Sequence, residues 1–309
     1  MNDIISIVVP VYNMQDYLSE CLDSLLCQTY KDIKIICIDD GSKDNSKEII
    51  NKYIKKDNRV SYHYQDNSGA ASARNHGIDV FMEDDSSNYL VFVDSDDIVE
   101  KDYVETLYKS LIENNADVSS CDKKKFNDNT PSDMKTFVLD KRETLKCYFK
   151  NVVFLESPVC KLFKKETFKD LRFPNGKHYE DTFLTYKIIE KCNRIAHINY
   201  YSYLIRVRDN SLTRSSYSNY EYDKVEAGLE IFNYYKGSEF ERLAYNKYLG
   251  IIYYFIIKTN KNKDKVSKNK VAIEEVKELV KKNGFRQADL RFIPFIIATK
   301  LNLLSLIRI

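Results

Sequence analysis

The chain has 309 residues, enough for one large domain or two domains of roughly 150 residues each. Its 48 basic and 46 acidic residues give a formal net charge of +2 at pH 7, which excludes a dedicated nucleic-acid binder on total charge. Residues 1–200 hold 28 basic and 34 acidic residues, a net charge of −6, and the remainder holds 20 and 12, a net charge of +8. We therefore expect the two parts to meet different partners.

The cysteines and the apolar segments indicate the compartment. Seven cysteines are scattered along the chain without a C-x-x-C pair, which argues against a disulfide framework and against a zinc site. The first residues lack the basic start and long apolar core of a signal peptide. The most apolar windows, 248–257 and 290–309, do not match a membrane span of about 20 apolar residues. We expect a cytoplasmic protein, soluble or peripherally bound to the inner face of the cell membrane.

The first hundred residues alternate between strand patterns rich in β-branched residues and amphipathic helix patterns. In chain order they predict a strand at 4–9, a helix at 17–26, a strand at 33–38, a helix at 46–53, a strand at 60–64, a helix at 70–82 and a strand at 89–93. Such alternation predicts a mostly parallel sheet covered by helices on both faces. Because ligands bind beyond the carboxyl ends of such strands, the polar segments 10–13, 39–42 and 94–97 should converge on one site.

The pattern weakens after residue 117, and we expect a surface loop over residues 122–132. Periodicity returns over residues 159–168, and an apolar helix at 183–189 follows Glu180 and Asp181. Beyond about residue 215 the pattern is mainly helical. We therefore expect an α/β domain that carries the ligand site over 1–215 and a helical, basic region over 216–309.

Three carboxylates lie within four residues after the last strand of the first hundred residues: Asp94, Asp96 and Asp97. They repel one another, so their ionisation is costly unless a cation is present. Hard oxygen ligands suit Mg²⁺ or Mn²⁺, which typically take one or two carboxylates together with substrate phosphates. The alternative is a helix N-cap, because aspartate favours that position and a helix could begin at Ile98.

The polar segments after the first two strands have two interpretations each. In 39–42, Gly41 permits a tight turn, and the carboxylates of Asp39 and Asp40 can accept hydrogen bonds from a base or from ribose hydroxyls. Turn formation alone also explains this sequence. Segment 10–13 offers an aromatic face and an amide to a nucleobase, and strand termination alone explains it equally. Their joint placement is what favours a ligand site.

Four segments stand in the order and spacing of family 2 glycosyltransferases of the A-type fold. They read IVVPVYN at 7–13, IDDGS at 38–42, NSGAASARN at 67–75 and FVDSDD at 92–97, and SPVCKLFK at 157–164 and HYEDT at 178–182 extend the similarity. The chain therefore resembles that family. The resemblance implies an α/β fold, a Rossmann-like mixed sheet with helices on both faces, followed by a mainly helical C-terminal region.

The resemblance implies a nucleoside-diphosphate sugar as donor, with uridine as the family's commonest base. The residues that it places around the base, ribose and sugar are Pro10, Tyr12, Asn13, Asp39, Asp40, Ser68, Gly69, Arg74 and Asn75. It makes Asp94 a contact to ribose and metal, with Ser95 in the same donor segment, and Asp96 the direct ligand of Mn²⁺ or Mg²⁺. Asp97 is then a supporting residue or a helix cap.

Asp181 is expected to be the general base, since with Glu180 it matches the Glu-Asp pair that opens a helix on the acceptor side of the family. A carboxylate that takes the proton of an acceptor hydroxyl, while the anomeric carbon is attacked from the opposite face, gives inversion. Without the resemblance, the pair is explained by the helix dipole. Lys161 fits the family's lysine and would support the acceptor side, or it shares one solvated helix face with Lys164 and Lys165.

The expected activity is inverting transfer of a sugar from a UDP-sugar to a hydroxyl of a glycan or lipid-linked glycan, in cell-surface polysaccharide synthesis. A sugar nucleotidyltransferase, the rival enzyme, would need a glycine-rich basic loop where PVYN stands at 10–13. A non-catalytic sugar-nucleotide-binding module is the other alternative. Such a module would tolerate loss of the acidic residues, yet Asp94, Asp96 and Asp181 are all present.

The basic C-terminal region has no motif that identifies an acceptor. Lysines between 258 and 270, followed by the apolar segment 290–309, fit an element that lies on anionic lipid. An ordinary solvated lysine-rich segment followed by a packed terminal helix explains them equally. Peripheral membrane contact is therefore one of two expectations for this region.

Overall fold

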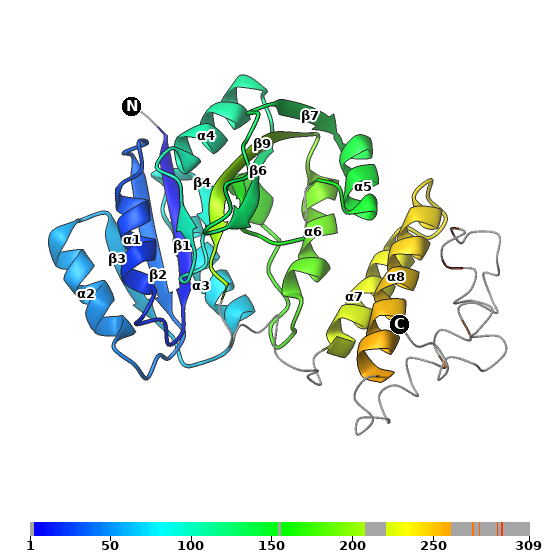
Figure 1. Ribbon diagram of the computed structural model, residues 1–309, viewed down its shortest axis with the longest axis horizontal. Helices are drawn as coiled ribbons and strands as arrows, with labels where there is room; N and C mark the ends of the chain where they lie inside the picture. Colours follow the sequence, from blue (N-terminus) through cyan, green and yellow to red (C-terminus); the bar gives the residue numbers. More distant parts are fainter. Residues whose placement is uncertain are drawn as a thin grey trace.

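The computed structural model describes residues 3–153, 156–207 and 221–260, together with Glu274, Glu278, Asp289 and Phe292. Over these residues the chain forms a mixed sheet of nine strands with helices on both faces, and two further helices lie beside it (Figure 1). The α/β fold class expected from the sequence is confirmed.

The first half of the sheet is parallel. Its elements are β1 (Ile4–Val11), α1 (Leu18–Leu26), β2 (Ile33–Asp39), α2 (Ser46–Lys56), β3 (Val60–Tyr64), α3 (Ala70–Glu83) and β4 (Ser87–Phe92). The strands lie in the order β3-β2-β1-β4. Right-handed crossovers place α1 and α2 on one face and return α3 across the other. Each predicted element of this half is present, with bounds within three residues of those expected.

The second half is mixed. Its elements are β5 (Ile98–Val99), α4 (Tyr103–Glu113), β6 (Val118–Lys125), β7 (Thr136–Asp140), α5 (Lys141–Lys150), β8 (Lys161–Lys164), the 3-10 helix η1 (Lys165–Phe168), α6 (Glu180–Lys191) and β9 (Arg194–Ile205). Strand β8 lies antiparallel between β4 and β6, so the sheet continues as β4-β8-β6-β9-β5, and β7 pairs with β9. Strand β8 therefore joins the two halves.

One expectation and two of the alternatives left open for this half are wrong. The surface loop expected from residue 122 begins only after Lys125, because β6 runs to that residue beside β9. A helical face through Lys161 is wrong because insertion between two strands makes this segment β8, and tertiary pairing overrides local pattern. A helix cap at Asp97 is wrong because Ile98 and Val99 form β5.

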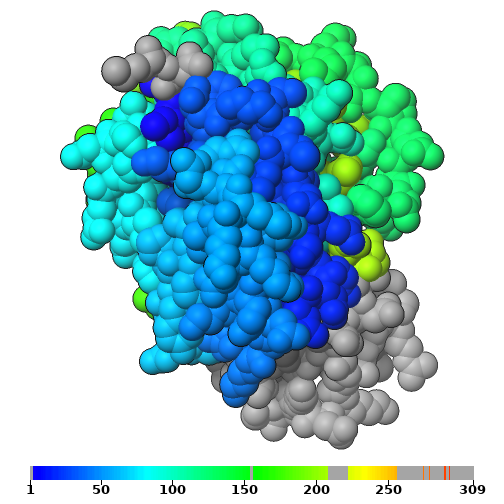
Figure 2. Space-filling model, turned by 90° about the vertical axis from the view of Figure 1, so that its left-hand side faces the viewer, coloured from blue at the N-terminus to red at the C-terminus, as the bar shows by residue number. Residues whose placement is uncertain are grey.

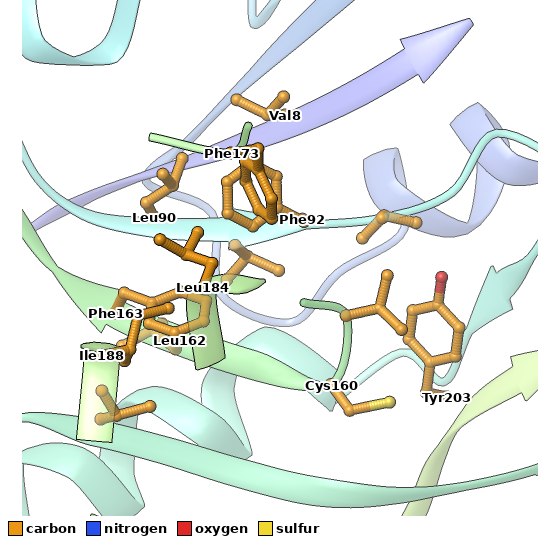
Figure 3. Close-up of a cluster of buried hydrophobic side chains, with 14 of the residues drawn as sticks. Val8, Leu90, Phe92, Cys160, Leu162, Phe163, Phe173, Leu184, Ile188 and Tyr203 are labelled. Carbon is orange, nitrogen blue, oxygen red and sulfur yellow. The ribbon is translucent and has the colours of Figure 1, made fainter. Parts of the chain in front are cut away.

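A shared core holds the halves together (Figure 3). Phe92 of β4 meets the rings of Phe163 and Phe173 edge-on, with centroids 6.2 and 5.8 Å apart. Leu184 and Ile188 of α6 belong to the same buried cluster. Helix α6 is thus fixed to the centre of the sheet through its apolar face.

Two helices follow β9 along the chain, α7 (Glu221–Tyr234) and α8 (Glu241–Asn260), packed against each other (Figure 1). Helix α7 also contacts α6, and α8 contacts α5. The mainly helical region expected here is confirmed over these residues, whereas the boundary expected near residue 215 lies outside the described chain. The face that Figure 2 turns toward the viewer consists largely of blue and cyan residues from the first hundred.

No described helix combines the length and apolar character needed to cross a membrane. The lysine-rich stretch from residue 261 onward and most of the segment 290–309 lie outside the described residues. The expectation of membrane contact through that region therefore stays a prediction.

Candidate functional site

The candidate site lies where β1, β2 and β4 end and where α3 and α6 begin. The backbone amide of Asp40 donates to the carbonyl of Val11 (2.8 Å), so the ends of β1 and β2 are joined directly. The guanidinium of Arg74, in α3, contacts both Asp94 after β4 and Glu180 at the start of α6. The polar segments that follow the three strands therefore meet at one edge of the sheet, together with the start of α6.

The segment after β1 is held in place by its own asparagine. Asn13 has a left-handed backbone (φ 54°), and its side-chain oxygen accepts a hydrogen bond from the amide of Lys43 at 2.8 Å. The backbone amide of Asn13 donates to the hydroxyl of Ser42 at 3.1 Å. Pro10 pairs with Ile38 inside the sheet, whereas Tyr12 is 42% exposed. Tyr12 therefore offers an accessible aromatic ring beside an ordered loop.

The two aspartates after β2 are buried and organise the surrounding loops. Asp39 accepts hydrogen bonds from the amide of Ser42 (2.9 Å) and from the hydroxyl of Tyr62 (2.9 Å). The turn-forming interpretation of this sequence thus has direct support. A role in base binding is compatible with it, because a carboxylate offers about four acceptor positions.

Asp40 connects the end of β2 to the start of α3. Its carboxylate accepts hydrogen bonds from the side-chain amide of Gln65 (2.7 Å) and from the backbone amides of Ser68 (2.8 Å) and Gly69 (2.9 Å). Gly69 has φ +90°, a conformation that glycine adopts without strain. These bonds fix the loop that opens α3.

Arg74 and Asn75, one turn further along α3, point to the second half of the molecule. The side chain of Asn75 donates to the carbonyl of Phe173 (2.8 Å) and accepts from its amide (2.8 Å). It therefore binds the segment before α6 as a strand partner would. Arg74 is buried, and its Nη2 lies 2.9 Å from Oδ1 of Asp94, while Nη1 contacts Glu180. Burial opposes its charge, yet Asp94 and Glu180 hold the pKa of Arg74 above its usual range.

Residues 94–97 form a tight turn after β4. The amide of Asp97 donates to the carbonyl of Asp94 (3.0 Å), and Ser95 is buried within the turn. Arg206, just after β9, donates from its backbone amide to Oδ1 of Asp97 (2.9 Å) and from Nε to the carbonyl of Asp96 (3.1 Å). The turn is therefore anchored from the far end of the sheet.

The donor set of this turn fits a shared cation. Asp94 and Asp96 carry carboxylate oxygens, the ligands that suit Mg²⁺ or Mn²⁺. Burial, followed by the charges of Asp94 and Asp96, raises the pKa of Asp97 to about 7, so the turn electrostatically favours added positive charge. Over the described residues, no group of three or more potential ligand side chains is arranged around a metal position.

Glu180 and Asp181 open α6, as expected from the sequence. The preceding residue, Tyr179, has a left-handed backbone (φ 58°), which turns the chain sharply into the helix. Asp181 accepts a hydrogen bond from the amide of Thr182 at 2.8 Å. Burial, followed by the charges of Glu180 and Glu156, raises the pKa of Asp181 to about 6.

Lys161 lies at the start of β8 and is only 4% exposed. Its ammonium donates to the carbonyl of Ser157, and burial lowers the pKa of Lys161 to about 8. The charge of Asp181 acts in the opposite direction on Lys161. The lysine therefore belongs to the buried surroundings of Asp181 rather than to a solvated surface.

Sequence reasoning missed two charged groups near Asp181. Glu156 accepts a hydrogen bond from the hydroxyl of Thr182 (3.0 Å) and pairs with Lys247 of α8 (2.8 Å). The one available signal was Lys247 itself, a cation beside the most apolar window of the chain. A lone lysine in such a run usually needs a buried partner.

A protein-family model described as Glycosyl transferase family 2 matches residues 6–172. Glycosyltransferase GlyA of Streptococcus pneumoniae is 37% identical over 228 residues, which cover 69% of this chain and 32% of GlyA. Glycosyltransferase GlyG of the same organism is 36% identical over 230 residues, which cover 70% of this chain and 75% of GlyG. This chain thus spans about a third of GlyA and three quarters of GlyG.

Solved structures agree on the fold. Residues 1–349 of S. aureus TarS in complex with UDP-GlcNAc superpose with a TM-score of 0.73 at 20% identity, covering 98% of this chain and 89% of that one. The mannosyltransferase PcManGT from Pyrobaculum calidifontis, in complex with GDP-Man and Mn²⁺, gives a TM-score of 0.53 at 14% identity, covering 97% and 83%. The A-type fold expected from the sequence is confirmed. Because the family model matches more than half of its residues, the chain belongs to glycosyl transferase family 2.

Proposed function

We propose that the chain is an inverting glycosyltransferase that moves a sugar from a UDP-sugar to a hydroxyl of a glycan or lipid-linked glycan. The observation that carries this proposal is the double contact of Arg74. One buried guanidinium binds Asp94, in the acidic turn after β4, and Glu180, beside Asp181 at the start of α6. A donor held at the acidic turn therefore lies next to a carboxylate that can act on an acceptor.

The donor occupies the edge formed by β1, β2 and α3. Tyr12, exposed at the end of β1, packs on the base, and the loops held by Asp39 and Asp40 enclose it. The other residues assigned to donor binding are Pro10, Asn13, Ser68, Gly69, Asn75 and Ser95. UDP is the preferred carrier because S. aureus TarS, which shares this fold, binds UDP-GlcNAc.

Asp94 and Asp96 hold Mn²⁺ or Mg²⁺ in this proposal. When bound, such an ion supplies positive charge that stabilises the departing diphosphate. Arg74 holds Asp94 in position, and Arg206 fixes the backbone of the same turn. These residues thereby keep the acidic turn ordered in spite of its internal repulsion.

Asp181 is the general base. Its carboxylate takes the proton of the acceptor hydroxyl while that oxygen attacks the anomeric carbon from the face opposite the diphosphate, which inverts the configuration. General-base assistance is typically worth about 10²–10⁴-fold in rate. Glu180 pairs with Arg74, and Lys161 adds a positive charge on the acceptor side.

A thermal-shift panel tests donor binding. UDP, GDP and several of their sugars, each with and without Mn²⁺, are added to the full chain, and UDP compounds with Mn²⁺ should raise the melting temperature most. Equal shifts with all nucleotides, or no shift, would contradict the donor assignment. Asp96→Ala should remove the effect of Mn²⁺.

A turnover assay tests the base. Asp181→Asn should lower UDP release from the selected UDP-sugar by at least about 100-fold while UDP binding persists. The matched control is Asp170→Asn, because Asp170 is an exposed partner of Lys191 and has no part in the proposed chemistry. Near-wild-type turnover by Asp181→Asn would refute the assignment.

The setting proposed for this reaction is the cytoplasm, at the inner face of the membrane, during assembly of a cell-surface polysaccharide. The net charge of +8 beyond residue 200 supports attraction to anionic lipid. Co-sedimentation with anionic vesicles should weaken when residues 290–309 are deleted. Unchanged binding would count against membrane contact through this segment.

A further inference from the structure

The buried ion pair between Glu156 and Lys247 links the C-terminal helices to the candidate base. Lys247, in α8, is 5% exposed in its side chain, and its ammonium lies 2.8 Å from Oε1 of Glu156. The same ammonium donates to the side-chain oxygen of Asn151 at 3.1 Å and lies 4.1 Å from the centre of the Tyr148 ring. Lys247 thus crosses from α8 to α5 and to the segment that precedes β8.

The other side of Glu156 holds the first turn of α6. Its Oε2 accepts a hydrogen bond from the hydroxyl of Thr182 (3.0 Å), and its backbone carbonyl accepts one from the hydroxyl of Thr185 (2.8 Å). Both threonines are buried. Thr182 in turn donates its amide to the carboxylate of Asp181 at 2.8 Å. Lys247, Glu156, Thr182 and Asp181 therefore form a continuous chain of contacts.

We propose that Lys247 and Glu156 are positioning residues for sugar transfer, and that their ion pair orients the carboxylate of Asp181 through Thr182, whose hydroxyl binds Glu156 and whose amide binds Asp181. The inference rests on the proposed function, because it takes Asp181 as the base. It assigns the C-terminal helices a part in the reaction centre itself, in addition to any contact with acceptor or membrane.

Charge is the reason why this pair influences the reaction as well as the fold. The groups that face Asp181 or Glu156 are Arg74 of α3, Tyr148 of α5, Lys161 of β8, Lys224 of α7, Lys247 of α8 and the adjacent Glu180. Burial opposes the charge of Glu156, but Lys247 and Lys224 hold its pKa below the usual range. Glu156 therefore stays ionised, and its charge helps to raise the pKa of Asp181.

One single and one double variant separate the effect of position from the effect of charge. In Lys247→Met the carboxylate of Glu156 loses its partner, and we expect kcat to fall about tenfold or more, because small displacements of a reacting group are costly. In Glu156→Gln/Lys247→Met no buried charge is left unpaired, and the glutamine oxygen still accepts from Thr182. The double variant should recover most of the lost kcat.

The decisive readout is the pH profile of kcat/KM for UDP release from UDP-N-acetylglucosamine with Mn²⁺. The charge of Glu156 helps to raise the pKa of Asp181, so its removal in the double variant should move the acid limb toward lower pH by about one pH unit. A purely structural pair would change the amount of folded enzyme and leave the profile in place. If the midpoint of the acid limb stays within about 0.2 pH units of the wild-type midpoint, the inference is overturned.

The controls separate this inference from the proposed function. Arg142→Met/Glu239→Gln removes an exposed ion pair between α5 and the segment before α8, and it should match the wild type in kcat and in pH profile. UDP-induced thermal shifts should be the same in all variants. If Asp181→Asn retains turnover, the proposed function and this inference both fail. If Asp181→Asn loses turnover and the double variant keeps the wild-type profile, only this inference fails.

Discussion

In the parallel half of the sheet, the buried carboxylates of Asp39 and Asp40 accept hydrogen bonds from nearby loops, whereas in the second half the partly buried carboxylates of Glu156 and Glu180 pair with cations from distant segments. Asp40 is held by backbone amides of the loop before α3. Glu156 and Glu180 instead depend on Lys247 and Arg74. A backbone amide is present whatever residue supplies it, but an ion pair requires one particular side chain. The second half should therefore be more sensitive to single substitutions.

The largest effect is expected at Arg74, which joins the two halves. Arg74→Met leaves the carboxylates of Asp94 and Glu180 without their shared partner. Removing one member of a fully buried pair typically costs about 3–5 kcal/mol, and the 36% exposure of the Asp94 side chain brings the expected loss to the lower end of that range. Urea unfolding at pH 7 measures this loss. Arg142→Met, at an exposed pair, should leave the free energy of unfolding unchanged. A loss below about 1 kcal/mol for Arg74→Met would remove the basis of the comparison.

A smaller loss is expected at Asp40. In Asp40→Asn a side-chain amide replaces one acceptor, so one backbone or side-chain donor of the loop loses its partner, at a cost of about 1–3 kcal/mol. The same unfolding measurement applies, with Asp85→Asn at an exposed position as the matched control. If Asp40→Asn proves more damaging than Arg74→Met, the order of sensitivity between the halves is reversed.

The smallest effect concerns pH. The raised pKa of Asp181, about 6, means that the base takes up a proton as the pH falls through 6, so kcat/KM at pH 5 should be about a tenth of its plateau. Asp97, with a pKa of about 7, also titrates near this range. The control is therefore Asp97→Asn, whose profile of kcat/KM against pH should keep the wild-type inflection near pH 6. A flat profile between pH 5 and 7 would contradict the environment described for Asp181.

The carboxylate of Asp181 affects folding stability in the opposite direction, since stability falls as the pH rises. Because the pKa of Asp181 is higher in the folded state than the value of about 4 expected when unfolded, the folded protein binds this proton more tightly. Its contribution to stability is fully present below pH 4 and is lost as the pH rises through 6. Asp181→Asn should remove this pH-dependent component of the unfolding free energy.

Much of the fold could be predicted because the parallel half follows local rules. Strands such as Ile33–Asp39 are continuous apolar runs that end in turn residues, and the helices between them are amphipathic. The segment at Lys161 could not be predicted, because its strand forms only through pairing with β4 and β6. Local pattern does not contain that information.

Part of the site was predictable because its motifs are local in the sequence. Motifs located Asp94, Glu180 and Asp181 and predicted that they belong together, and the structure joins Asp94 to Glu180 through Arg74. Motifs did not indicate that the Asp40 carboxylate is committed to loop hydrogen bonds. Nor could they locate the contact between Glu156 and Lys247, which depends on how α8 packs.

The separation of Glu156 and Lys247 along the chain has a consequence for synthesis in the cell. Lys247 follows Glu156 by about 90 residues, which at translation rates of roughly 5–20 residues per second amounts to a delay of about 5–18 s. During that delay the carboxylate has left the ribosome without its cation. The first turn of α6 therefore acquires its final setting only after α8 has emerged, so a prematurely terminated chain would carry a donor-binding half beside an unfinished reaction centre.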